Sequence, residues 1–74
     1  VVALDCEMVT TLNGFELGRL SIVSENSQVL LDTYVTPCNP ILDYNTKYSG
    51  LTEELMSGAP SLLEVREKVL ALVG

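Results

Sequence analysis

The chain has 74 residues, of which 47% are hydrophobic and 19% are charged. This balance excludes a disordered segment, and the length allows at most one domain, whose core would be small and marginally stable. No apolar run reaches the roughly 18–20 residues of a bilayer span, so we expect no membrane contact. The net charge of −6, with only four basic residues, excludes a basic nucleic-acid surface. Any nucleic acid would have to be bound through a metal ion.

The first predicted strand covers residues 1–9 and carries two acids, Asp5 and Glu7, on one face. Residues two apart on a strand point to the same side, with Cα atoms roughly 6.5–7 Å apart. The opposite face is formed by Val2, Leu4, Cys6 and Met8. All four are apolar, so we expect the strand to be buried. Buried acids are costly unless a cation compensates them, and Mg²⁺ needs only one or two carboxylates beside water and phosphate.

A solvated strand face is the alternative explanation of this acid-x-acid triplet, because such triplets are common on exposed strands. The neighbours on the acids' own side are Val1, Ala3 and Val9. A solvated face would carry polar residues there instead. The sequence therefore favours a metal site at Asp5 and Glu7.

Polar turns separate two further predicted strands. We expect a turn at 10–14, a strand at about 16–24, a tight connection at 25–28 and a strand at 29–36. Short connections imply antiparallel neighbours, so the opening is predicted to be a three-stranded meander. Pro37 ends the third strand, and residues 37–48 are predicted to form an irregular crossing.

Two helices are predicted after the crossing. Thr52 is a candidate N-cap for a short helix that runs through Met56. Ser61 and Glu64 have the spacing of a capping box at the start of a longer helix. Apolar residues follow at helical spacing, and we expect them to cover the sheet: Leu62, Val65, Val69 and Leu72.

Four segments of the sequence resemble those of a known family. The segments concerned are Ala3 to Met8 (ALDCEM), Gly14 to Val23 (GFELGRLSIV), Asp32 to Pro37 (DTYVTP) and Asp43 to Glu54 (DYNTKYSGLTEE). Together they resemble the Rex-type RNA exonucleases of the DEDDh (DnaQ-like) 3′→5′ exonuclease superfamily. The resemblance implies a ribonuclease H-like α/β exonuclease fold. Residues 1–74 would be a partial exonuclease domain, its N-terminal half, with the three-stranded antiparallel meander followed by helices.

The resemblance also implies roles for individual residues. Asp5 and Glu7 fall on the family's first motif, whose acids hold two Mg²⁺ or Mn²⁺ ions and are catalytic. Met8 lies where the family places the sugar of the terminal nucleotide, with simple core packing as the alternative. Asn45 stands where some relatives carry Arg, which could contact a ribose hydroxyl or a base edge. A turn-stabilising Asn is the alternative there.

Two tyrosines and one arginine have competing interpretations. Tyr44 and Tyr48 could stack on a base, but we favour a role in pinning the crossing to the sheet. Arg19 is expected to pair with a nearby acid instead of a phosphate. Asp32 and Asp43 are interpreted as surface or turn acids.

The implied activity is hydrolysis of phosphodiester bonds from the 3′ end of single-stranded RNA, in RNA processing. DNA is an alternative substrate, and we expect no small-molecule cofactor. The chain contains no histidine, so the family's general base and its further aspartates would lie beyond these residues. We therefore expect the segment alone to be inactive. The resemblance points to the nucleus or nucleolus, with the cytoplasm as an alternative.

Two other functions remain open at this point. One is a non-catalytic RNA-binding or scaffolding module derived from an exonuclease fold. The other is a small acidic interaction domain unrelated to nucleases. The downstream sequence of the parent protein would separate the first from an enzyme, and Mn²⁺ titration would test the second.

Overall fold

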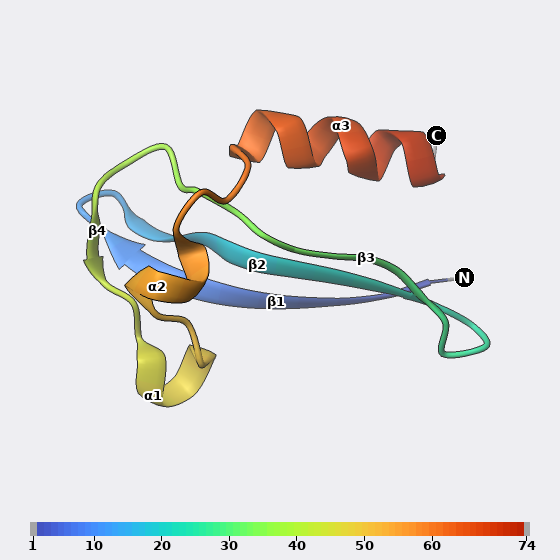
Figure 1. The fold of residues 1–74 in the computed structure, drawn as a ribbon, viewed down its shortest axis with the longest axis horizontal. Helices are drawn as coiled ribbons and strands as arrows, with labels where there is room; N and C mark the ends of the chain where they lie inside the picture. Colours follow the sequence, from blue (N-terminus) through green and yellow to red (C-terminus); the bar gives the residue numbers. More distant parts are fainter. Residues whose placement is uncertain (1, 74) are drawn as a thin grey trace.

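A computed structural model describes residues 2–73 as a four-stranded sheet with three helices (Figure 1). The strands are β1 (Val2–Thr11), β2 (Gly14–Ser24), β3 (Val29–Tyr34) and β4 (Ile41–Asp43). The helices are α1 (Thr46–Ser49), α2 (Glu53–Met56) and α3 (Leu62–Val73). The strand order is β3-β2-β1-β4, and every pair is antiparallel. The predicted meander followed by helices is confirmed, with a short fourth strand added.

The hairpin of β1 and β2 carries an irregularity beside the acids. Glu7 lies opposite Arg19, but Met8 lies opposite Leu17, so Gly18 is an extra residue on β2. Such a bulge bends its strand and increases the local twist. A side chain could not be added at Gly18 without a clash, because a Cβ there would lie 2.6 Å from a side-chain carbon of Leu51.

The core consists of two clusters on opposite faces of the sheet. The first contains Leu20, Ile22, Val35 and Val65, with Leu17, Leu31 and Val69 packed against it. The second contains Val9, Leu51 and Met56, with Tyr34, Ile41 and Tyr44 packed against it. Val65 and Val69 of α3 therefore cover β2 and β3, and Figure 1 shows α3 running along the sheet. The helical spacing predicted the same role for Leu62 and Leu72, but these two side chains are 42% and 45% exposed, so the prediction was wrong for them.

The apolar face of β1 is exposed, and the prediction of a buried strand was wrong for this structure. Leu4 is 63% exposed, Val2 is 41% exposed, and Cys6 and Met8 are also accessible. The reason is that α3 covers β2 and β3, while no element between residues 2 and 73 covers this part of β1. On its outer edge, β1 pairs with β4 only at Thr10 and Thr11.

The segment that follows β3 is more ordered than predicted. It contains β4 and α1, each of which is too short to give a clear periodic signal in the sequence. Glu16 anchors the segment to the hairpin, since its carboxylate accepts hydrogen bonds from the Asn39 amide at 2.7 Å and the Cys38 N–H at 3.1 Å. The Thr11 hydroxyl donates to the same carboxylate at 2.6 Å.

Acidification should release the 37–40 segment from the hairpin. Hydrogen bonds from the Thr11 hydroxyl, then from Asn39 and the Cys38 N–H, lower the pKa of Glu16 below its ordinary value of 4.5. Because the folded-state pKa is the lower one, their contribution to stability is complete above that value and is lost as the pH falls through the folded-state pKa. We expect the amide protons of Cys38 and Asn39 to titrate below pH 4.5 in NMR spectra. In Glu16→Gln these shifts should stay flat, and a midpoint at or above 4.5 would contradict the assignment.

Both predicted helix caps are confirmed. The Thr52 hydroxyl accepts a hydrogen bond from the Leu55 N–H at 3.2 Å. Ser61 and Glu64 form the reciprocal capping box, with N–H to side-chain distances of 3.4 and 3.3 Å. Within the described residues, none of the helices has the length and apolarity needed to cross a membrane.

Candidate active site

Two acids on β1 form the centre of the candidate site. Asp5 and Glu7 share one face of the strand, opposite Ser21 and Arg19 of β2. Asp5 is exposed and Glu7 is half-buried, so the burial cost that first suggested a cation does not apply to this structure. Among residues 2–73, neither carboxylate forms a hydrogen bond or an ion pair. Their oxygen atoms are therefore available for another partner.

The two carboxylates fit the requirements of Mg²⁺ or Mn²⁺. Hard cations use oxygen ligands, and one or two carboxylates suffice when water and substrate phosphate complete the shell. In the described part of the chain, no three His, Cys, Asp or Glu side chains come together as a metal site. A third His, Cys, Asp or Glu ligand would therefore have to come from outside residues 2–73.

The cation opposite Glu7 on β2 is Arg19, and it is already engaged. The Arg19 guanidinium donates two hydrogen bonds to Asp32, at 2.9 and 2.7 Å, and lies 5.7 Å from the centre of the Tyr34 ring. This pairing lowers the pKa of Asp32, and it raises the pKa of Arg19, to which the charge of Glu7 adds a smaller effect. The expectation that Arg19 pairs with an acid is confirmed.

A groove of about 420 Å³ lies along the edge of β1 beside α1. It is lined by Cys6, Glu7, Met8, Phe15, Asn45, Tyr48 and Ser49. The structure thus brings together three of the four residues that the resemblance assigned to the site, Glu7, Met8 and Asn45. Asp5 is the fourth, and it does not line the groove.

Asn45 holds α1 against β1. Its backbone is left-handed, with φ of 53°, and it precedes the first turn of α1. Its side-chain amide donates to the Thr10 hydroxyl at 3.0 Å and to the Met8 carbonyl at 3.4 Å. Its own N–H donates to the Asp43 carboxylate at 2.8 Å. These contacts support the turn-stabilising interpretation, and contact with a substrate stays a prediction.

The two tyrosines of this region have different environments. Tyr44 is half-buried and packs against the Val9 cluster, as predicted for a residue that pins the crossing. Tyr48 is 84% exposed, so the same prediction was wrong for Tyr48. Phe15 was missed by the sequence analysis. The hairpin predicted from the sequence could have indicated it. Phe15 follows the turn and pairs with Thr10, so it lies near Met8 on β1.

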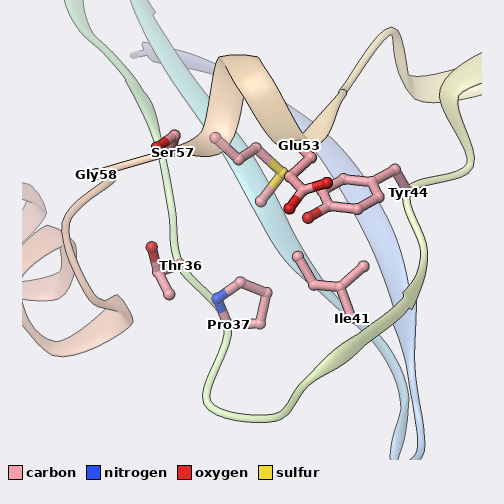
Figure 2. Close-up of a pocket in the computed structure, with 8 residues that line it drawn as sticks. Thr36, Pro37, Ile41, Tyr44, Glu53, Ser57 and Gly58 are labelled. Atoms are coloured by element: carbon pink, nitrogen blue, oxygen red, sulfur yellow. The ribbon is translucent and has the colours of Figure 1, made fainter.

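A second cavity, of about 300 Å³, lies between α2 and the segment that follows β3 (Figure 2). Its lining includes Tyr44, Glu53, Ile41 and Pro37. None of the four residues assigned to the site lines it, and its side-chain polar groups in Figure 2 are the Glu53 carboxylate and the hydroxyls of Thr36, Tyr44 and Ser57. We assign it no role.

Similarity to known proteins decides the family. The chain is 46% identical over 63 residues, 85% of its length, to an uncharacterized exonuclease of Schizosaccharomyces pombe. It is 42% identical over 73 residues to the human RNA exonuclease 1 homolog and 44% identical over 75 residues to RNA exonuclease 4 of Cryptococcus neoformans, each over 97% of the chain. The chain belongs to the Rex-type RNA exonuclease family.

The similarity covers a small part of those Rex-type relatives. The matched stretch is 10%, 6% and 18% of the lengths of the three proteins, in the same order. No protein-family model matches the chain. The small α/β structure with its four-stranded antiparallel sheet is compatible with the fold of an exonuclease.

Proposed function

We propose that these residues are the N-terminal part of the exonuclease domain of a 3′→5′ exoribonuclease, built on the ribonuclease H-like fold. One observation carries the proposal. Asp5 and Glu7 lie on one face of β1 with carboxylates that have no partner within residues 2–73, in a stretch that resembles the first motif of the Rex-type family. A solvated structural pair of acids would not need to coincide with that motif.

In this proposal Asp5 and Glu7 hold two Mg²⁺ or Mn²⁺ ions. When bound, such a pair activates water and stabilises the charge on the leaving 3′ oxygen. The chain's own contribution is to hold both carboxylates on one strand, where the pairing with β2 fixes their spacing. Arg19 directs its two hydrogen bonds to Asp32, so within residues 2–73 it forms no ion pair with Glu7 and leaves that carboxylate open to a cation.

Met8 and Asn45 are the proposed contacts for the terminal nucleotide. Both line the groove that Glu7 also lines, which is the support for placing the substrate there. Met8 presents an accessible apolar side chain suited to the face of a sugar. Asn45 is shorter than Arg and already bonded to β1, so its contribution would come through the position of α1 more than through a strong contact.

The proposed substrate is the 3′ end of single-stranded RNA. Support comes from the relatives that are named RNA exonucleases in human and Cryptococcus neoformans. Single-stranded DNA is the competing substrate, since discrimination by the 2′-hydroxyl needs a complete pocket. A role in RNA processing, in the nucleus or nucleolus, is part of the same proposal.

The general base is expected from another part of the protein. No histidine occurs among the 74 residues, and proton transfer by a positioned side chain typically contributes about 10²- to 10⁴-fold to a rate. We therefore propose that the 74-residue chain alone releases no nucleotides, whereas the full-length protein does.

The test is to follow the shortening of 5′-labelled single-stranded RNA by the full-length protein. We expect a ladder of products shortened from the 3′ end one nucleotide at a time, with Mg²⁺ or Mn²⁺ and not with EDTA. A DNA strand of the same sequence gives the preference for the sugar, and the 74-residue chain is the matched inactive sample. RNA binding by the full-length protein without any shortening would instead indicate a non-catalytic module.

A further inference from the structure

The chain has four aromatic side chains, Phe15, Tyr34, Tyr44 and Tyr48. Tyr34 and Tyr44 pack against the core cluster around Val9. Phe15 and Tyr48 are 73% and 84% exposed, and both line the groove beside Glu7. The fold of residues 2–73 therefore does not use these two rings for its core. It gathers them in one groove instead.

Both rings are attached to well-anchored backbone. Phe15 lies at the start of β2, opposite Thr10 of β1. Tyr48 lies in α1, which is fastened to β1 by the Asn45 side chain and closed by the Ser49 hydroxyl, which donates to the Tyr44 carbonyl at 2.8 Å. The backbone under the rings is therefore fixed before any ligand arrives, which limits the ordering cost of binding.

The charges around the groove indicate what kind of ligand fits. The Lys47 ammonium lies over the Tyr48 ring, 5.8 Å from its centre, within the range of a cation–π contact. Lys47 does not line the groove, but through the Tyr48 ring it places a positive charge beside it, to which an anionic group can bind. The two rings offer a surface for a flat apolar group, and Glu7 offers a ligand for a metal-bound group. A nucleotide combines a flat base with an anionic phosphate. The groove of about 420 Å³ lies within the usual range for small-ligand sites.

We propose that Phe15 and Tyr48 form a stacking platform for the base at the 3′ end of the RNA. The inference rests on the proposed function, and it adds the groups that hold the base. Every base has a π-face, so a platform of this kind accepts any sequence, as an exonuclease that shortens RNA stepwise requires. Lys47, which lies over the Tyr48 ring, meets a phosphate of the same strand. Met8, which lines the groove together with both rings and Glu7, contacts the sugar.

The test measures RNA binding by the full-length protein in EDTA, which makes the readout independent of metal ions and of turnover. A fluorescent single-stranded oligonucleotide is compared with one that lacks only the base of its 3′-terminal nucleotide. We expect Tyr48→Ala and Phe15→Ala each to weaken binding of the intact oligonucleotide by about 5- to 150-fold. On the abasic oligonucleotide the same variants should have little effect, because the contact that they remove is already absent.

Matched variants separate stacking from general damage. Tyr48→Phe keeps the ring and should bind like wild type, whereas Tyr48→Leu keeps the apolarity without the ring and should bind weakly. Leu12→Ala removes an exposed apolar side chain of the same hairpin that does not line the groove, and it should change nothing. Circular dichroism confirms that each variant is folded.

Three results would overturn the inference. They are equal losses on the intact and the abasic oligonucleotide, no loss with either alanine variant, and no RNA binding by wild type. The proposed function fails separately, if wild type binds RNA in EDTA and prefers the intact end but never shortens the RNA when Mg²⁺ or Mn²⁺ is supplied. In that case the platform would stand and the catalytic role would not.

Discussion

Asp5→Asn and Glu7→Gln should each lower the rate of RNA shortening by the full-length protein by at least about 100-fold. The amides keep the shape of the side chains but lose the negative charge that holds a divalent cation. Losing even an outer-shell partner of a metal ligand typically costs 10- to 100-fold, so the loss of a ligand itself should reach or exceed that range. The measurement is single-turnover decay of a 5′-labelled RNA with saturating Mg²⁺.

Folding should survive these two substitutions. Asp5 is exposed, and neither acid has a partner among residues 2–73, so no buried interaction is broken. The chain carries a charge of −6, and removing one of two neighbouring like charges should leave the melting temperature unchanged or slightly higher. Glu67→Gln on the exposed side of α3 is the matched control and should keep full activity. Unchanged shortening by Asp5→Asn/Glu7→Gln would refute the assignment of the acids.

Gly18→Ala should destabilise the protein by about 1–3 kcal/mol, the usual cost of inserting a methyl group into a packed core. The added Cβ would lie 2.6 Å from Cδ1 of Leu51, and Val9 and Met56 would also be in close contact at 3.2 and 3.3 Å. All three neighbours are buried, so none can move away freely. Urea unfolding, at constant m-value, measures the change in the free energy of unfolding.

A second substitution shows whether the crowding is the cause. Leu51→Ala alone should cost about 2–5 kcal/mol, because it leaves a cavity beside Gly18. In Gly18→Ala/Leu51→Ala the new methyl group occupies part of that cavity. The double variant should therefore lose less stability than the sum of the losses of the two single variants. Strict additivity would show that the bulge, and not contact with Leu51, makes alanine unfavourable there.

Local signals in the sequence were sufficient for most of the elements. The turn around Asn13-Gly14, the N-cap at Thr52 and the capping box at Ser61 each depend on a few neighbouring residues, and each is present in the structure. Strand ends were less accurate. The first strand extends to Thr11, because Thr10 and Thr11 find partners in Phe15 and Gly14 across the hairpin.

The short elements and the exposure of apolar side chains could not be predicted from local sequence signals. β4 has three residues and α1 has four, so neither is long enough for a strand or helix pattern to repeat. Their existence depends on contacts with β1 that are distant in sequence, such as the side chain of Asn45 on Thr10. Whether an apolar face is buried depends likewise on what packs over it, and Leu4 has nothing over it within residues 2–73.

The sequence by itself determined the pair of acids on one strand, the meander, the caps and the family resemblance. Each of these depends only on the types of residues that lie close together along the chain. The tertiary structure alone decided that Glu7, Met8 and Asn45 share a groove, and that Phe15 and Tyr48 are exposed in it. The physical reason is that α1 returns to the edge of β1 only after the chain has crossed from β3. Contacts across 30 to 40 residues leave no periodic trace in the sequence.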